Sequence, residues 1–209
     1  DDNAANRFAA DLRGFSECDI VQLPSRELVM ADVVGVSRGY EQRRLAALDE
    51  LTEAHFAVAS VQAAAQRTMP PEALKAAIVT LAAGETAPLD ELAQSLTRAG
   101  YERCVQVEGI GQFSIRGGIL DVFPPQAEHP YRVEFWDDEI DSISTFDVGS
   151  QRRLEQCECL RCLPCMESIP ALAKGGAAGL AKAVLALTST RRKKQHADLQ
   201  TNLERDAER

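Results

Sequence analysis

The segment that most constrains the fold of this chain is residues 101–147, in which apolar and polar side chains alternate. The apolar residues at every second position are Phe113 and Ile115 in one part, and Tyr131, Val133 and Phe135 in another. A period of two places one set of side chains on a core and the other set away from it, so the pattern predicts strands with one buried face. Glycines and prolines punctuate the segment, which indicates several short strands in an antiparallel sheet.

The face of these strands that points away from the core carries an unusual set of residues. Arg116 projects opposite to the apolar residues of its strand, and Arg132 and Trp136 share one side of theirs with Glu134 between them. If the two strands pair, one surface holds two arginines and the only tryptophan of the chain. Arg and Trp are enriched among the residues that dominate interface energies, so this surface is a candidate docking site. The alternative is that Trp136 packs under a neighbouring loop and both arginines are solvated.

Two turns are predicted within the same segment. Gly117 and Gly118 follow Arg116 directly, and a glycine pair in a strand pattern indicates a bulge or a sharp bend. Residues 137–139 are expected to form the turn into a last strand at residues 140–146.

The chain before this segment alternates helical and extended patterns. We expect helices at residues 6–15 and 36–51 and strands at residues 18–23 and 55–61, the second strand being covered on both faces. Ser37 is the expected cap of the second helix. Helices that alternate with strands predict an α/β layer with a parallel sheet.

A second domain is expected to begin near residue 79, where the pattern changes. Pro71 suits the first turn of a short helix before that boundary. After it, Asp90 is the expected cap of a helix that ends at Gly100, where a left-handed backbone is needed. This helix should pack on the antiparallel sheet, giving an α+β domain.

The segments that follow the sheet are less regular. Residues 154–163 are expected to be extended again, and residues 180–187 to be helical. Gly175, Gly176 and Gly179 argue against a rigid helix at the start of that region.

The charge and hydropathy of the chain restrict its partners. Its 209 residues contain 32 acidic and 23 basic side chains, a net charge of −9, which predicts poor general binding of nucleic acid.

No apolar run is long enough to cross a bilayer and no signal peptide opens the chain, so we expect a soluble, cytoplasmic protein without a membrane partner. The basic block at residues 191–194 is expected to be a solvated helix face, with nucleic-acid contact as the alternative. Because the chain starts at Asp1 and not at Met, we expect a piece of a longer protein.

Four cysteines, namely Cys157, Cys159, Cys162 and Cys165, fall within nine residues. Thiolates at such spacing could hold zinc or an iron–sulfur cluster. Structural zinc sites usually separate two cysteine pairs by a longer loop, and an extended segment would place Cys162 on the opposite face from Cys157 and Cys159. We therefore expect no metal, no disulfide, and reduced cysteines that serve as small buried side chains.

No arrangement of residues typical of catalysis is visible. His55, His129 and His196 are dispersed and have no Ser or Cys partner in a recognisable pattern. The phosphate-loop motif GxxxxGK[ST] does not occur in the chain. We therefore expect that this chain is not an enzyme and holds no cofactor.

Several motifs carry a resemblance to a known family. The runs QVEGIGQFSIRGGILDVFPP, HPYRVEFWDDEIDSISTFD and SQRRLE closely resemble the second domain of bacterial transcription-repair coupling factors, which is similar in turn to a domain of excinuclease component B. LPSRELVMADVVGVSRGYEQRRL and HFAVASVQAAAQRTMPPEAL are characteristic of the first domain of the same family, and LRCLPCMES matches more weakly. The resemblance thus covers nearly the whole chain.

The resemblance implies a domain organisation. Residues 1–78 correspond to the first part of a degenerate, RecA-like, nucleotide-binding-like domain with a parallel sheet. Residues 79–166 correspond to an inserted α+β domain that binds excinuclease component A, and residues 167–209 to a helical return to the first domain.

The resemblance also implies a function and a binding site. In this family the second domain recruits excinuclease component A of nucleotide excision repair to stalled RNA polymerase, through two arginines and an aromatic residue. These map onto Arg116, Arg132 and Trp136, with Trp in place of the expected Phe, and replacing either arginine should remove binding without unfolding. Contacts with RNA polymerase and double-stranded DNA, and the ATP- and magnesium-dependent translocase, belong to other domains of the parent. The alternative is part of an ATP-dependent DNA helicase or translocase such as excinuclease component B, with a phosphate loop upstream of Asp1.

Overall fold

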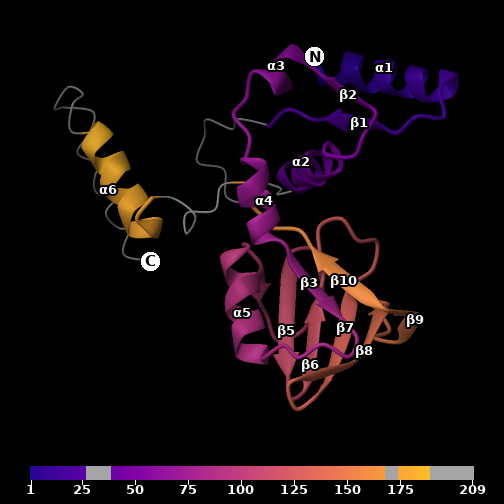
Figure 1. Cartoon of the computed structure of the whole chain (residues 1–209), viewed down its shortest axis with the longest axis vertical. Coiled ribbons are helices and arrows are strands. Elements are labelled where there is room, and N and C mark those ends of the chain that lie inside the picture. Colours follow the sequence, from indigo (N-terminus) through magenta and orange to yellow (C-terminus); the bar gives the residue numbers. More distant parts are fainter. Residues whose placement is uncertain (27–38, 168–173, 189–209) are drawn as a thin grey trace. The chain divides into compact units, whose positions relative to one another are not determined.

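The computed structural model describes residues 1–26, 39–167 and 174–188, and the chain divides into two compact units, residues 1–167 and 168–209 (Figure 1). The predictions for Ser37 and for residues 191–194 lie outside the described residues. The described elements form a mixed α/β chain with parallel and antiparallel strand pairs, as expected.

The first part of the larger unit is a small α/β layer. Its elements are, in chain order, α1 (Asp2–Phe15), β1 (Ile20–Leu23), α2 (Gly39–Glu50) and β2 (Phe56–Ala59). The Asp1 side chain caps α1 by accepting a hydrogen bond from the backbone N–H of Ala4 at 2.8 Å. β1 and β2 pair in parallel, with Ile20 beside Phe56, which confirms the predicted parallel sheet.

The prediction that the second strand is covered on both faces is wrong for the described residues. α1 packs against Ile20 and Val58 and closes one face of the strand pair. On the other face, α2 packs against Val21 and Leu23 of β1. Val58 is therefore the only buried residue of β2, because no described element closes the second face of that strand.

Two short helices lead to the second part of this unit. They are α3 (Val61–Ala64) and α4 (Pro71–Ala77), followed by β3 (Val79–Ala82) and α5 (Leu89–Arg98). Pro71 occupies the first turn of α4, as predicted. The predicted cap of α5 is wrong: Pro88 is the capping residue, and Asp90 lies inside the first turn, where its charge faces the free backbone N–H groups. Gly100 follows α5 with φ +90, which confirms the left-handed position predicted for it.

A six-stranded sheet forms the body of the second part, in the order β4-β5-β6-β7-β8-β9. Figure 1 labels its strands β5 to β9. Its strands are β4 (Glu102–Arg103), β5 (Gln112–Arg116), β6 (Ile119–Val122), β7 (Tyr131–Trp136), β8 (Glu139–Phe146) and β9 (Arg153–Cys157). All neighbours are antiparallel except β4 and β5, so the predicted antiparallel sheet is confirmed with one short parallel addition. β10 (Cys159–Cys162) pairs instead with β3, in a separate antiparallel pair.

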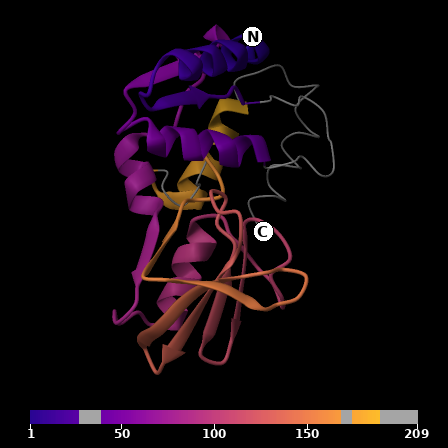
Figure 2. The ribbon, with the colours of Figure 1, turned by 90° about the vertical axis from the view of Figure 1, so that its right-hand side faces the viewer.

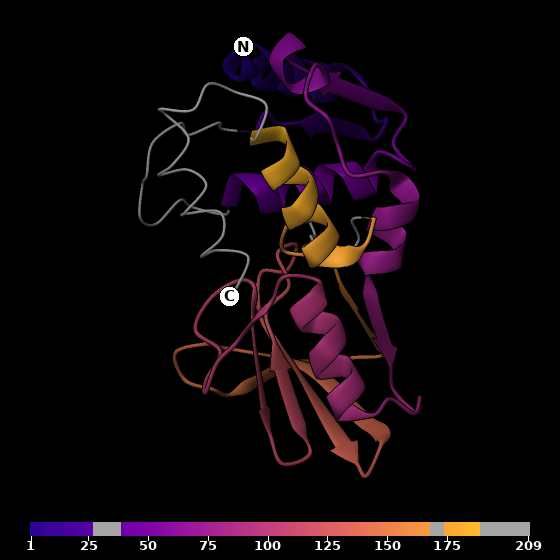
Figure 3. The same ribbon diagram turned by 90° about the vertical axis from the view of Figure 1, so that its left-hand side faces the viewer.

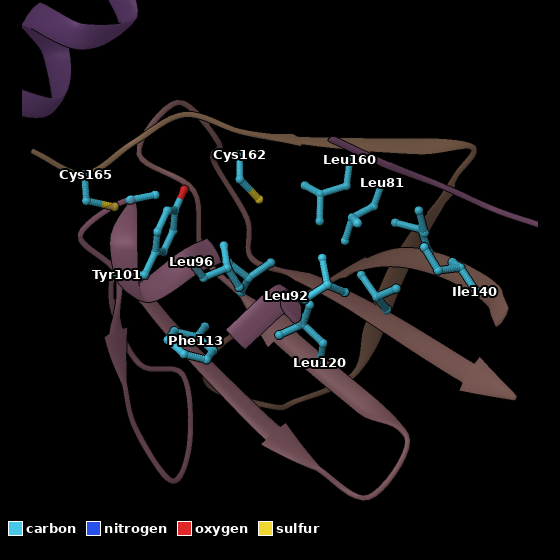
Figure 4. Packing of buried hydrophobic residues seen from close by; sticks show 14 residues of the cluster. Leu81, Leu92, Leu96, Tyr101, Phe113, Leu120, Ile140, Leu160, Cys162 and Cys165 are labelled. Carbon is cyan, nitrogen blue, oxygen red and sulfur yellow. The ribbon is translucent and has the colours of Figure 1, made fainter. Parts of the chain in front are cut away.

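The main core lies between one face of the six-stranded sheet, α5 and the β3–β10 pair (Figure 4). The sheet contributes Phe113, Leu120, Val133, Ile140 and Ile143, α5 contributes Leu92 and Leu96, and the strand pair contributes Leu81 and Leu160. α5 lies in front of the strands in Figure 3 and behind them in the opposite view of Figure 2. This face of the sheet is therefore closed.

The two predicted turns are both present, one in a different form. Arg116 pairs directly with Ile119, so Gly117 and Gly118 are the two residues of a hairpin turn, with Gly117 at φ +59, and not a bulge within a strand. Asp137, at φ 58, turns β7 into β8 as expected. The pairing is irregular elsewhere, between residues 134 and 135 of β7.

The second unit contains α6 (Gly176–Thr188). The predicted helix at residues 180–187 is confirmed, but it starts earlier than expected, and Gly179 lies inside it. A single glycine in a helix costs only about 1 kcal/mol relative to alanine, so it did not prevent the helix. Among the described residues, no helix is long and apolar enough to cross a membrane.

Candidate protein-docking face

The two arginines predicted for the site lie on strands that do not pair with each other. β6 runs between β5, which carries Arg116, and β7, which carries Arg132. The two strands therefore do not pair directly, but β6 joins both into one sheet. Asp121 of β6 lies directly opposite Arg132 and Ser114 in the strand register, on the face of the sheet that points away from the main core.

Asp121 joins the two arginines. Its Oδ1 accepts a hydrogen bond from Nε of Arg132 at 2.7 Å, and its Oδ2 accepts from Nη2 of Arg132 at 2.9 Å and from Nη2 of Arg116 at 2.6 Å. The Asp121 side chain is only 1% exposed. A buried carboxylate is stable only when it is paired and hydrogen-bonded, and here two guanidinium groups supply both conditions.

Arg132 is held on several sides. Beyond the bidentate pair with Asp121, it donates hydrogen bonds to the backbone oxygen of Gln151 at 3.3 Å and to Oε1 of Gln151 at 3.2 Å. Its guanidinium carbon lies 4.4 Å from the centre of the Phe146 ring, a cation–π contact. The hydrogen bonds to Asp121 raise the pKa of Arg132 above its ordinary value. With 17% of its side chain exposed, Arg132 is part of the framework of this face.

Arg116 and Trp136 are the accessible members of the predicted set. The Arg116 side chain is 47% exposed, and among the described residues it hydrogen-bonds Asp121 alone. Trp136 is 80% exposed at the end of β7, next to the turn. The alternative in which Trp136 packs under a loop and both arginines are solvated is therefore wrong for Trp136 and for Arg132. We name the surface formed by Arg116, Asp121, Arg132 and Trp136 the docking face.

A small second core supports one end of the docking face. Val107, which belongs to the loop that joins β4 and β5, is buried together with Phe123 and Phe146. The Ser114 hydroxyl donates a hydrogen bond to the backbone oxygen of Val105 at 2.9 Å, which fastens this loop to the sheet. Phe146 is thus packed on apolar neighbours and contacts the Arg132 guanidinium, so that the arginine rests on a rigid base.

A second ion pair borders the docking face. Arg153 of β9 pairs with Glu134 of β7, and the Ser142 hydroxyl donates to Glu134 at 3.0 Å. The hydrogen bond from Arg153 is the largest cause that lowers the pKa of Glu134 below its ordinary value. Because the folded pKa is the lower one, this contact stabilises the fold above the ordinary carboxyl pKa, and the stabilisation is lost as the pH falls through the folded value.

The four cysteines of residues 157–165 are free thiols in different environments. Cys162 and Cys165 are buried, whereas Cys159 is exposed, so the expectation of buried cysteines is wrong for Cys159. The described residues contain no group of three or more His, Cys, Asp or Glu side chains placed to hold a metal ion. Figure 4 shows the Tyr101 hydroxyl on the side of Cys162 and Cys165, where it donates to the Leu163 backbone oxygen at 2.6 Å. Burial raises the pKa of the Cys162 thiol to about 12.

These environments predict selective thiol modification. A maleimide reagent near neutral pH is expected to label Cys159 in the native protein and to leave Cys162 unlabelled. Because the thiolate is the reactive form, the raised pKa of Cys162 slows the reaction of its thiol, and burial slows that reaction further. Peptide mass spectrometry with and without denaturant measures both sites. Equal labelling of the two cysteines in the native protein would contradict the burial of Cys162.

The comparisons with known proteins concern the same part of the chain. Residues 79–167 match the sequence model of a family described as the UvrB interaction domain. The transcription-repair-coupling factor of Bacillus subtilis is 37% identical over 169 residues, which are 79% of this chain and 14% of that protein. This chain is a member of the transcription-repair-coupling-factor family. The coupling factor of Escherichia coli K12 is 33% identical over 165 residues, which are 78% of this chain and 14% of that protein. The coupling factor of Mycobacterium tuberculosis is 37% identical over 164 residues, which are 74% of this chain and 13% of that protein.

This coupling-factor segment therefore spans about 14% of the length of these relatives. The docking face lies wholly within the UvrB interaction domain.

Sequence reasoning missed three residues of the docking face and its supports: Asp121, Phe146 and Gln151. One signal could have revealed Asp121. It is the only charged residue in the four-residue apolar strand β6, and a carboxylate in such a strand requires a cationic partner. No comparable signal marks Gln151, which reaches Arg132 from a loop 19 positions away.

Proposed function

We propose that the coupling-factor segment binds excinuclease component A of nucleotide excision repair through Arg116, Arg132 and Trp136 of the docking face. The observation that carries the proposal is the 80% exposure of Trp136 on the same sheet face as a half-exposed arginine. An exposed tryptophan beside an arginine is the composition of an interface hot spot. The location of this face within the UvrB interaction domain supports the excinuclease as partner.

The energetic contributions of the two exposed residues differ in kind. Covering Trp136 removes a large apolar surface from water, which contributes on the order of 4 kcal/mol before the costs of association. Arg116 offers N–H donors in a planar fork, which favours a carboxylate in one orientation. The tryptophan thus supplies affinity, and the arginine supplies the register of the complex.

The proposed role in the parent protein is recruitment of excinuclease component A to stalled RNA polymerase in the cytoplasm. Contacts with RNA polymerase and double-stranded DNA, and ATP- and magnesium-dependent translocation, are assigned to other domains of the parent.

The first part of the segment, residues 1–78, is proposed to be a degenerate RecA-like layer. The parallel pairing of β1 and β2 between α1 and α2 supports that assignment.

A nucleotide-binding function within this segment is the second candidate, and two observations speak against it. The first part contains a hollow of about 890 Å³ between α1, β1 and α2. Its lining includes the carboxylates of Asp1, Asp2 and Glu50, which repel phosphate groups, although Arg13 and Arg43 also reach it. The chain supplies no phosphate-loop motif that would bring backbone N–H groups to the anion.

Replacing Arg116 with alanine tests the proposed function. We expect affinity for excinuclease component A to fall by about 30-fold or more, the loss typical of an interface hot spot. The fold should be retained, because Arg132 still holds Asp121 by two hydrogen bonds. Isothermal titration calorimetry with the 209-residue chain measures the affinity, and thermal unfolding monitors the fold.

Arg161→Ala is the matched control. Arg161 is also 47% exposed and also paired with one aspartate, Asp49, but it lies on β10, outside the docking face. Its replacement should leave the affinity unchanged. If Arg116→Ala and the unmodified chain bind excinuclease component A with equal affinity, Arg116 is not part of the binding site.

A further inference from the structure

The carboxylate of Asp121 is the point on which both arginines of the docking face converge. It is buried, and it accepts three hydrogen bonds of 2.6–2.9 Å from the two guanidinium groups. We infer that Asp121 is a positioning residue for docking: it fixes the Arg116 guanidinium in the orientation that accepts a carboxylate of the partner. This inference rests on the proposed function.

Arg116 needs such support because little else restrains it. It is the last residue of β5, next to the Gly117–Gly118 turn, and nearly half of its side chain is in solvent. A free arginine side chain samples many rotamers and loses that freedom when a partner binds. The hydrogen bond from Nη2 to Oδ2 of Asp121 orders the guanidinium before binding, and such pre-organisation increases affinity.

The register of the sheet places Asp121 where it can do this. Arg116 pairs with Ile119, and Asp121 lies two residues further along β6 on the same face as Arg116. Arg132, directly opposite Asp121, holds both carboxylate oxygens, so that the acceptor itself cannot rotate. Arg132 thus fixes Asp121, and Asp121 fixes Arg116.

The charge of this cluster indicates the chemistry of the partner. Two guanidinium groups and one carboxylate leave one net positive charge on the docking face of a chain whose net charge is −9. The N–H groups of Arg116 that do not face Asp121 form a planar donor set, which suits a carboxylate in a bidentate pair. Duplex DNA is disfavoured, because tight binding of its backbone requires several cationic contacts and not one.

Asp121→Asn weakens the positioning contact with little change in shape. The amide has one acceptor oxygen and no negative charge, so in either orientation its NH₂ group faces a guanidinium N–H group, and the hydrogen bond to Arg116 is lost or is no longer charge-assisted. Arg116 should then be held less firmly in its orientation.

The test is a double-mutant cycle of Asp121→Asn and Arg116→Ala, in the 209-residue chain titrated with purified excinuclease component A. Asp121→Asn is expected to weaken binding about tenfold when Arg116 is present and less than about twofold when Arg116 is alanine, because it acts through Arg116. A merely structural role would weaken binding by the same factor in both backgrounds, and that result would overturn the inference. Asp49→Asn, which alters the aspartate paired with Arg161, is the control and should change nothing.

A measurement on the unmodified chain covers the case in which Asp121→Asn fails to fold. Nitrogen-15 relaxation of the Arg116 Nε–H group is expected to show an ordered side chain in the free protein. A disordered Arg116 side chain would overturn the inference without any substitution.

The outcomes separate this inference from the proposed function. If the unmodified chain does not bind excinuclease component A, the proposed function fails. If it binds and Arg116→Ala weakens binding, but Asp121→Asn has equal effects in both backgrounds, only the inference fails. Binding of a fluorescent DNA duplex that depends on Arg116 would contradict the assignment of a carboxylate partner.

Discussion

Replacing Arg132 with alanine is expected to lower the free energy of unfolding by about 3 kcal/mol and to abolish docking, because it breaks a buried ion pair. Asp121 would keep only the single hydrogen bond from Arg116, and Phe146 would lose the guanidinium that covers its ring. The expected loss is at the lower end for such pairs because Arg116 still supplies a positive charge. Urea denaturation of the 209-residue chain, followed by circular dichroism, measures the change.

Arg153→Ala is the control for this prediction. Arg153 also pairs with a carboxylate of β7, Glu134, but it is 48% exposed, and such surface pairs contribute about 1 kcal/mol or less. If Arg132→Ala were as stable as Arg153→Ala, the buried pair would not contribute to the fold. For Arg132 we thus expect a loss of stability in addition to the lost binding that the sequence predicted. Arg116 is the arginine whose replacement separates docking from stability.

Replacing Glu167 with alanine is expected to lower the free energy of unfolding by about 4 kcal/mol, because it leaves a buried guanidinium without its counter-ion. Both oxygens of Glu167 accept from Nε of Arg44, at 3.0 and 3.2 Å, and both side chains are almost fully buried. Nε of Arg26 lies 3.5 Å from the same carboxylate. Thermal and urea unfolding of the 209-residue chain measure the loss.

The control for Glu167→Ala is Asp49→Ala. Asp49 pairs with Arg161 at 2.7 Å and also joins α2 to the region of β10, but that pair is exposed, so its loss should cost about 1 kcal/mol or less. If Glu167→Ala were no less stable than Asp49→Ala, the buried pair would have no special role. The Glu167 pair ties α2 to the chain that follows β10, within the unit of residues 1–167.

Much of the local structure could be predicted because it depends on neighbours in sequence. Alternating side chains predicted the strands of the sheet, Pro71 predicted the start of α4, and the left-handed position of Gly100 followed from the absence of a side chain. The failures have local causes as well. Pro88, and not Asp90 as expected, is the N-cap residue of α5. The glycines near residue 179 did not prevent α6 from forming.

The contacts that join distant segments could not be predicted in this way. Arg44 and Glu167 are 123 positions apart, and neither residue is unusual in its local pattern. A buried carboxylate needs a cation, but the chain offers 23 lysines and arginines, and only the packing of α2 selects Arg44.

For the docking face, the sequence by itself determined which side chains point away from the main core. Strand residues two positions apart share a face, so Arg132, Glu134 and Trp136 had to lie together whatever the strand order. Only the tertiary structure decided what lies between the arginines. Neighbouring strands are about 4.8 Å apart, so inserting β6 between β5 and β7 separates the arginines by two strand spacings and places Asp121 within reach of both. Strand order and register depend on the pairing of distant segments, and for that reason the sequence identified Arg116, Arg132 and Trp136 but not the carboxylate that holds the two arginines in place.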